Sequence, residues 1–98
     1  MKITWTDESI QSTIEIRDYI AKDNPVLAEE WVNKMMSSIE DQLMIFPESG
    51  RIVPEINDPN IRELIRGNYR AIYQFEKQNV SILKIVHSKR DFKPNMLH

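Results

Sequence analysis

An apolar stripe in the first half of the chain constrains the fold more than any other feature of this sequence. Apolar residues between positions 28 and 46 recur at intervals of three and four, the spacing that places side chains along one side of an α-helix. They are Ala28, Trp31, Val32, Met35, Met36, Ile39, Leu43 and Phe46. Asn24 can cap this helix, Pro25 suits its first position, and Pro47 ends it. The pattern predicts a helix of about five to six turns with one long buried face.

A shorter helix is expected before it. Thr6 and Asp7 are good N-cap residues, and Ile10 and Ile14 begin an apolar side that the residues further on widen. Asp23-Asn24-Pro25 leaves only a very short link between the two helices, which predicts an antiparallel helical hairpin. Before the first helix, residues 2–5 alternate between polar and apolar side chains, as in a short strand.

After Gly50 the apolar period changes from that of a helix to that of a strand. We expect strands over residues 51–53, 61–66, 69–75 and 80–86, with a hairpin turn at Gly67-Asn68 and another turn at 77–79. The predicted fold class is therefore α+β, in the order β-α-α-β-β-β-β. A single domain over 1–98 has its helical hairpin on one face of a small, twisted, mostly antiparallel sheet, and the other face is left open. From about residue 89 we expect a tail without regular structure.

Composition excludes several classes of protein. The 98 residues include no cysteine, which rules out disulfides and thiolate chemistry, and we expect neither a metal nor a cofactor. No stretch is long and apolar enough for a membrane span, and the N-terminus lacks a signal peptide, so we expect a cytoplasmic protein with no membrane partner. The net charge of −2 is uneven, at −5 for residues 1–46 and +3 for 47–98. An anionic partner is thus expected to meet the second half.

Several segments together resemble the RelE/ParE toxin superfamily of type II toxin–antitoxin systems. They are Asn24-Pro25 with Ala28, Phe46-Pro47-Glu48-Ser49-Gly50-Arg51, Arg62-Glu63-Leu64-Ile65, Asn68-Tyr69-Arg70-Ala71-Ile72-Tyr73 and Ile82-Leu83-Lys84-Ile85-Val86-His87. The resemblance implies a toxin of the plasmid-stabilisation type that is neutralised by a cognate antitoxin. It also implies a small acidic antitoxin, with a DNA-binding N-terminus, encoded in the adjacent reading frame. Through this antitoxin the complex would reach operator DNA.

The superfamily has two branches with different targets. The short link between the helices, the Phe-Pro-x-x-Gly-Arg stop and the Arg-Glu-Leu-Ile block are more similar to the ParE-like branch. That branch implies inhibition of DNA gyrase without catalysis by the toxin itself. The mildly negative net charge favours the same branch, because a nuclease that works on the ribosome benefits from a strongly basic surface.

The alternative is a RelE-like, metal-independent endoribonuclease that cleaves mRNA in the ribosome. Glu55, Arg70 and His87 resemble the base, phosphate-binding cation and acid that such a reaction needs. Each also has a plainer interpretation: Glu55 as a solvated carboxylate, Arg70 as a surface partner of Glu63, and His87 as a structural residue. We therefore assign no catalytic residue. A third hypothesis is a non-toxic module that only binds an antitoxin.

Arginines in the second half of the chain form the predicted partner-binding set. Arg62 and Arg66 share one face of their strand by the period-two rule, and guanidinium groups suit carboxylate or phosphate recognition. The full predicted set is Arg51, Arg62, Arg66 and Arg70, with Lys89 and Arg90 of the tail. A solvated sheet edge kept soluble by charge is the plainer interpretation.

Overall fold

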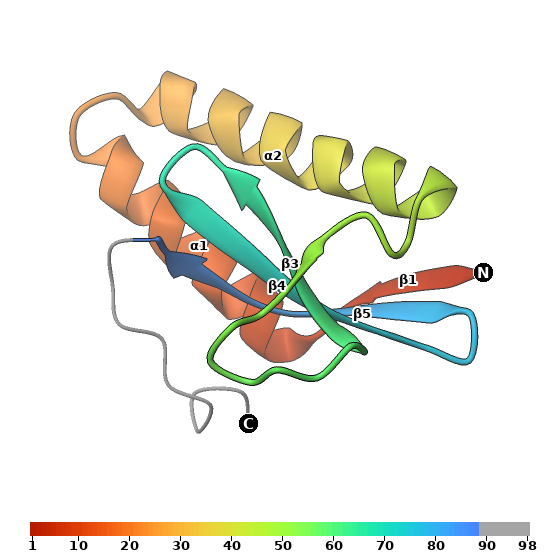
Figure 1. Ribbon diagram of the computed structural model, residues 1–98. Coiled ribbons are helices and arrows are strands. Elements are labelled where there is room, and N and C mark those ends of the chain that lie inside the picture. Colours follow the sequence, from red (N-terminus) through yellow and green to blue (C-terminus); the bar gives the residue numbers. More distant parts are fainter. Residues whose placement is uncertain (89–98) are drawn as a thin grey trace.

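The computed structural model describes residues 1–88 (Figure 1). The segment with the apolar stripe forms a helix, and the segments with period-two patterns form strands. The elements are β1 (Lys2–Trp5), α1 (Asp7–Ala21), α2 (Pro25–Ile45), β2 (Arg51–Ile52), β3 (Ile61–Arg66), β4 (Tyr69–Glu76) and β5 (Asn79–His87). The predicted order and the α+β class are confirmed.

Local signals set most of the boundaries. The side chain of Thr6 caps α1 by accepting from the Ser9 backbone N–H, and the side chain of Asn24 caps α2 by accepting from that of Leu27. Gly67, with a φ of 57°, turns the chain between β3 and β4. The turn before β5 uses Lys77 and Gln78, both with positive φ, which is the geometry of a two-residue hairpin loop.

The five strands form one sheet in the order β1-β5-β4-β3-β2. Three of the four pairings are antiparallel, whereas β1 runs parallel to β5, with Lys2 opposite Asn79 and Trp5 opposite Ile82. The first strand of the chain therefore lies at one edge of the sheet, beside the last described strand.

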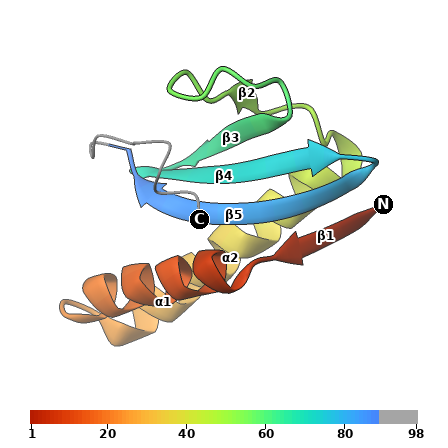
Figure 2. The ribbon, with the colours of Figure 1, turned by 90° about the horizontal axis from the view of Figure 1, so that it is seen from below.

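Both helices pack on the same face of this sheet, as predicted (Figure 2). The main core lies between the two helices and the sheet, and it consists of buried side chains from α1, α2, β3, β4 and β5. These are Ile16, Val32, Met35, Ile39, Leu43, Leu64, Ala71, Tyr73, Val80, Ile82 and Ile85. We call the side of the sheet that they cover the helix face. Most of the stripe on α2 is buried as expected, but Trp31 and Met36 are only partly buried, and Phe46, which caps the helix, is 63% exposed.

The buried side of α1 differs from the predicted one. Its buried residues are Ser9, Ser12, Thr13 and Ile16, while Ile10 is 44% exposed. The small hydroxyl side chains let α1 lie close to β5, where the Ser12 hydroxyl accepts a hydrogen bond from the Ile85 backbone N–H at 3.1 Å. The hydroxyls of Ser12 and Thr13 also donate to helix carbonyls, so their burial leaves no unpaired donor.

The opposite face is only partly open, which corrects the prediction of a bare face. Residues 53–60 fold back over it and close a second, smaller core of Val53, Ile61, Ile72 and Val86 (Figure 2). These residues alternate along their strands with those of the helix face, so a one-sided core would leave them in water. We call this second side the loop face.

Candidate functional site

A chain of four charged side chains crosses the loop face and centres on Glu63 of β3. One carboxylate oxygen of Glu63 accepts from Nε of Arg51, and the other accepts from Nε of Arg70. The side chain of Glu63 is fully buried and that of Arg70 is 7% exposed. A carboxylate buried to this extent needs such donors, because an unpaired charge in this position would be very costly.

Arg70 extends the chain of charges to the loop. Its two terminal nitrogens each donate to one carboxylate oxygen of Glu55, both at 2.9 Å. Hydrogen bonding from Arg70 lowers the pKa of Glu55 below its ordinary value, and the bond to Glu55 raises the pKa of Arg70. Arg70 pairs with Glu63 as its plainer interpretation had it, but the contact is buried and not at the surface, and Glu55 is not simply solvated because it accepts from Arg70.

The predicted arginine set divides between the two faces of the sheet. Arg62 and Arg66 lie on the helix face with Leu64, because alternate residues of a strand share a side. Arg66 donates to the Ser38 hydroxyl at 2.8 Å and to the Gln42 side chain at 2.7 Å, which ties β3 to α2. The four described arginines therefore do not form one surface, and the expected constellation is wrong as a geometric unit.

Arg62 is held by backbone carbonyl groups. It donates to the carbonyl oxygens of Pro59, Glu48 and Gly50, at 2.9 to 3.1 Å. The bonds to Glu48 and Gly50 join β3 to the turn that follows α2. Among the described arginines of the predicted set, Arg51 combines a place on the loop face with a largely exposed side chain, at 62%.

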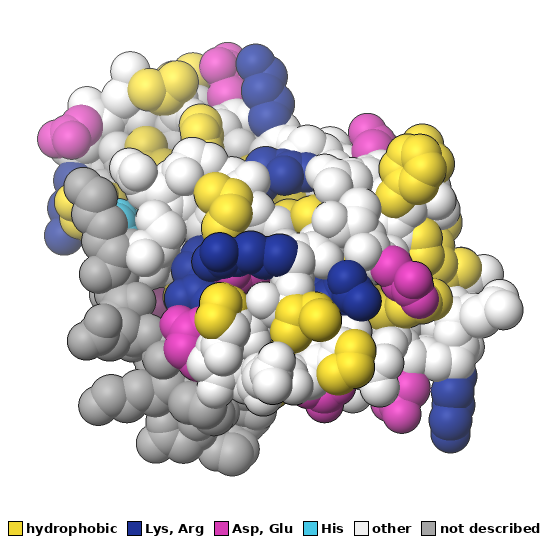
Figure 3. All heavy atoms as spheres, in the orientation of Figure 1, with side chains coloured by type: hydrophobic (Ala, Val, Ile, Leu, Met, Phe, Trp, Pro, Cys, Tyr) yellow, Lys and Arg dark blue, Asp and Glu magenta, His cyan; other side chains and the backbone are white. Residues whose placement is uncertain are grey.

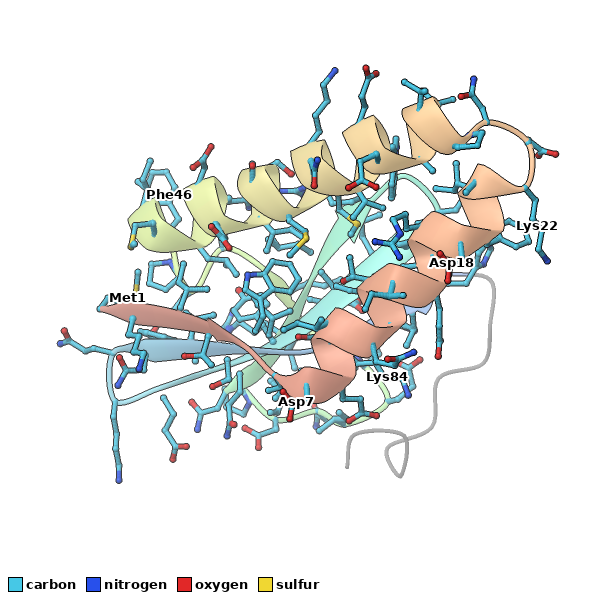
Figure 4. All side chains as sticks on the ribbon, turned by 180° about the vertical axis from the view of Figure 1, so that it is seen from behind. Met1, Asp7, Asp18, Lys22, Phe46 and Lys84 are labelled. Atoms are coloured by element: carbon cyan, nitrogen blue, oxygen red, sulfur yellow. The ribbon has the colours of Figure 1, made fainter. Side chains whose placement is uncertain are left out.

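His87 lies on the other side of the sheet from Arg70. It follows Ile85 at period two and packs edge-on against Tyr69, with 5.4 Å between ring centroids, while Tyr69 in turn packs against Trp31. A hollow of about 420 Å³ between α1 and β5 opens beside it, lined in part by Tyr19 and Tyr69. Figure 4 shows Lys84 of β5 close to the start of α1, where it pairs with Glu8 at 3.1 Å.

The proposed catalytic trio is consequently not assembled. Glu55 and Arg70 meet on the loop face, whereas His87 lies on the helix face, so the sheet itself separates the histidine from the other two. Lys89 and Arg90 lie outside the described residues. Within residues 1–88, no group of three or more His, Asp or Glu side chains is arranged to hold a metal ion.

Two features of the structure were not predicted from the sequence. The first is the buried ion network around Glu63. The sequence contained a signal for it, because Glu63 shares one side of its strand with Ile61 and Ile65, and that side would otherwise be apolar. Met44, Ile45 and Phe46 at the end of α2 are exposed to 56%, 68% and 63%. Met44 and Ile45 also had a signal, since they lie off the apolar stripe of their helix.

The fold and the sequence place this chain among the toxins of bacterial toxin–antitoxin pairs. Residues 3–92 match the family described as "ParE toxin of type II toxin-antitoxin system, parDE", and the chain therefore belongs to this family. No match was found among curated proteins. Among solved structures, a chain of the "Chromosomal ParDE TA system from P. aeruginosa" has the same fold, with a TM-score of 0.73 and 22% identity over 91% of this chain and 97% of that chain. No helix within residues 1–88 is long and apolar enough to cross a membrane.

Proposed function

We propose that this protein is the growth-arresting toxin of a type II pair, that a cognate antitoxin neutralises it, and that it acts by inhibiting DNA gyrase. Membership of the ParE toxin family supports the toxin role and the antitoxin partner. The choice of gyrase over the ribosome depends mainly on one observation, the placement of Arg70 and His87 on opposite faces of the sheet.

This placement counts against cleavage of RNA by the predicted trio. General acid–base catalysis requires each group to be within hydrogen-bond reach of the proton it transfers, and phosphate stabilisation requires the cation at the same centre. Glu55 and Arg70 can reach one another but cannot share a small substrate with His87 across a packed sheet. In addition, Arg70 already donates to two carboxylates, Glu55 and Glu63, which oppose the binding of an anionic phosphate.

The antitoxin is expected to bind through acidic side chains. Arg51 offers a largely exposed guanidinium on the loop face, and the excess of basic residues after position 46 suits an acidic partner. Arg62 and Arg66 are less suited to this role, since their guanidinium groups already donate to groups of the turn after α2 and of α2 itself.

A pair of assays on the purified toxin tests the proposal. We expect inhibition of gyrase supercoiling, relieved by an equimolar amount of the antitoxin encoded in the adjacent reading frame, and intact mRNA on programmed ribosomes. In cells, induction without antitoxin should give filaments and an SOS response. Cut messages with rapid arrest of translation would support the nuclease instead. Normal growth would support a binding module without toxicity.

A further inference from the structure

The end of α2 exposes an apolar patch that the fold does not use. Met44, Ile45 and Phe46 are all more than half exposed, and the partly buried ring of Phe75 from β4 lines the same depression as Ile45 and Phe46. We call Met44, Ile45, Phe46 and Phe75 the α2-end patch. Scattered apolar residues are normal on a protein surface, whereas successive exposed apolar residues beside an aromatic floor are typical of an interaction site.

The patch is hollowed and firmly held. A depression of about 440 Å³ is lined by Ile45, Phe46, Pro47, Glu48, Ser49 and Phe75. The turn that forms one wall is fixed by Arg62, which donates to the Glu48 and Gly50 carbonyls, and by the Gly50 N–H, which donates to the buried Tyr73 hydroxyl at 2.9 Å. A preformed surface of this kind loses little conformational freedom when a partner binds.

The helix side of the patch is acidic, while the basic side chain of Arg62 contacts the turn that forms one wall. Between Lys34 and Arg51 the chain has three acidic residues, Glu40, Asp41 and Glu48, and no basic one. Four-residue spacing puts Glu40 beside Met44 and Asp41 beside Ile45 on the helix surface. The helix dipole adds partial negative charge at the C-terminal end of α2, and no basic side chain occupies its last turn. Figure 3 shows hydrophobic side chains gathered at this end of α2 with acidic side chains beside them.

Charge and shape together indicate the class of partner. An apolar hollow with an acidic rim fits a protein segment whose apolar anchor residues are flanked by lysine or arginine. It does not suit an acidic antitoxin, because like charges would face each other. Enzymes that bind DNA present basic surfaces of the matching kind.

We propose that the α2-end patch is the surface through which the toxin docks on its cellular target, and that the docking segment is basic and amphipathic. The inference rests on the proposed function, because it takes the target to be a DNA-binding enzyme. It assigns target and antitoxin to separate surfaces: the acidic patch at the end of α2 for the target, and the basic residues of the second half for the antitoxin.

The test compares two pairs of exposed apolar residues on the same helix. The variant Ile45→Ser/Phe46→Ser removes the patch, and Val26→Ser/Leu27→Ser removes an equally exposed pair near the start of α2, where the two residues are 70% and 51% exposed. Surface changes of this kind alter the unfolding free energy by about 0.5 kcal/mol or less, so both variants should fold. Loss of two anchor residues should weaken gyrase inhibition about tenfold or more. The control pair should leave it unchanged.

A charge-reversal pair tests the acidic rim separately. Asp41→Lys/Glu48→Lys should weaken inhibition several-fold at low salt and should remove its salt dependence, because screening acts on the attraction that these residues provide. Glu29→Lys/Glu30→Lys, on the first turns of α2, is the matched control. Affinity for the antitoxin should be the same as in the parent for both patch variants.

Each outcome of these assays either supports the docking role of the α2-end patch or overturns it. The inference is overturned if a folded Ile45→Ser/Phe46→Ser variant inhibits gyrase as strongly as the parent. It is also overturned if this variant loses its affinity for the antitoxin but still inhibits gyrase. A patch that mediates self-association would show as a concentration-dependent change in mass that disappears in this variant, and this would also overturn it. If the parent does not inhibit gyrase, the proposed function fails. The patch is then tested by growth arrest in cells, which the variant should abolish whatever the target.

Discussion

The carboxylate of Glu63 is fully buried and accepts a hydrogen bond from Arg70, whose side chain is itself only 7% exposed. Arg51 and Glu55 complete the network at its two exposed ends. The network joins β2, β3, β4 and the loop of residues 53–60, so it fixes the loop over one face of the sheet.

Removal of Glu63 should destabilise the protein strongly. Glu63→Ala leaves the guanidinium of Arg70 buried with one partner fewer, and breaking a buried pair in this way costs about 3–5 kcal/mol. For a domain of this size that is a large part of the total free energy of unfolding. Urea denaturation measures the loss. Glu30→Ala on the exposed side of α2 is the control, and equal midpoints for the two variants would contradict the role given to Glu63.

The pair between Glu55 and Arg70 predicts a loss of stability in acid. Because Arg70 lowers the pKa of Glu55 in the folded protein, the pair stabilises the fold at pH values above the ordinary pKa of 4.5, and this contribution is lost as the pH falls through the lowered value. Glu55→Gln should therefore reduce the free energy of unfolding near neutral pH by about 1 kcal/mol, a small value since the carboxylate is partly exposed. Parent and variant should converge in acid. Denaturation curves at several pH values test this, and a constant difference down to the lowest pH would refute it.

Substitution of His87 should leave toxicity intact. His87→Gln removes an edge-on contact with the Tyr69 ring, which is worth about 0.5–1.5 kcal/mol, but it changes a side chain on the face of the sheet opposite to Arg70. Growth arrest on induction and inhibition of supercoiling should remain at the level of the parent. Loss of arrest in a variant with an unchanged melting temperature would restore the nuclease hypothesis.

Gly50 lies where no larger residue fits. A Cβ atom there would be 2.6 Å from the Glu63 carbonyl oxygen and 2.6 Å from the Tyr73 hydroxyl. Gly50→Ala should lower the free energy of unfolding by about 1–3 kcal/mol, since both neighbours are buried and cannot move aside. Tyr73→Phe should cost about 1–3 kcal/mol because it leaves the buried Gly50 N–H without its acceptor. Ser49→Ala, one residue earlier and exposed, should change the stability by less than either, and thermal melting would show whether it does.

The parts of the fold that depend on local signals were predictable. Asn24 and Pro25 define the start of α2, and Gly67 defines a hairpin, because capping and positive φ are decided by a few adjacent atoms. The side of α1 that faces the sheet was not predictable in the same way. Apolar periodicity favoured Ile10, but close approach to β5 favours the small hydroxyl residues Ser9 and Ser12.

The arrangement of the candidate site was harder to predict from the sequence than the fold. Period two places Arg62 and Arg66 on one side of β3 and Glu63 on the other, but which side meets the helices depends on the whole sheet. The contact of Arg70 with Glu55 depends on how residues 53–60 fold back, and no local pattern contains that information. The sequence could suggest single residues such as Arg62 and Arg70, but it could not show which of them tertiary structure brings together.

The parallel pairing of β1 with β5 has a consequence for biosynthesis. Lys2 and Asn79 are partners across a separation of 77 positions, and the Thr6 hydroxyl that caps α1 also donates to the carbonyl of Ile82. A nascent chain can form its helical hairpin early, because the contacts within the hairpin are local. Strand β1, in contrast, cannot pair in the sheet until β5 has left the ribosome. The edge strand β1 precedes the other described strands in the chain but is the last to find its partner, so its pairing with β5 is expected to close the sheet.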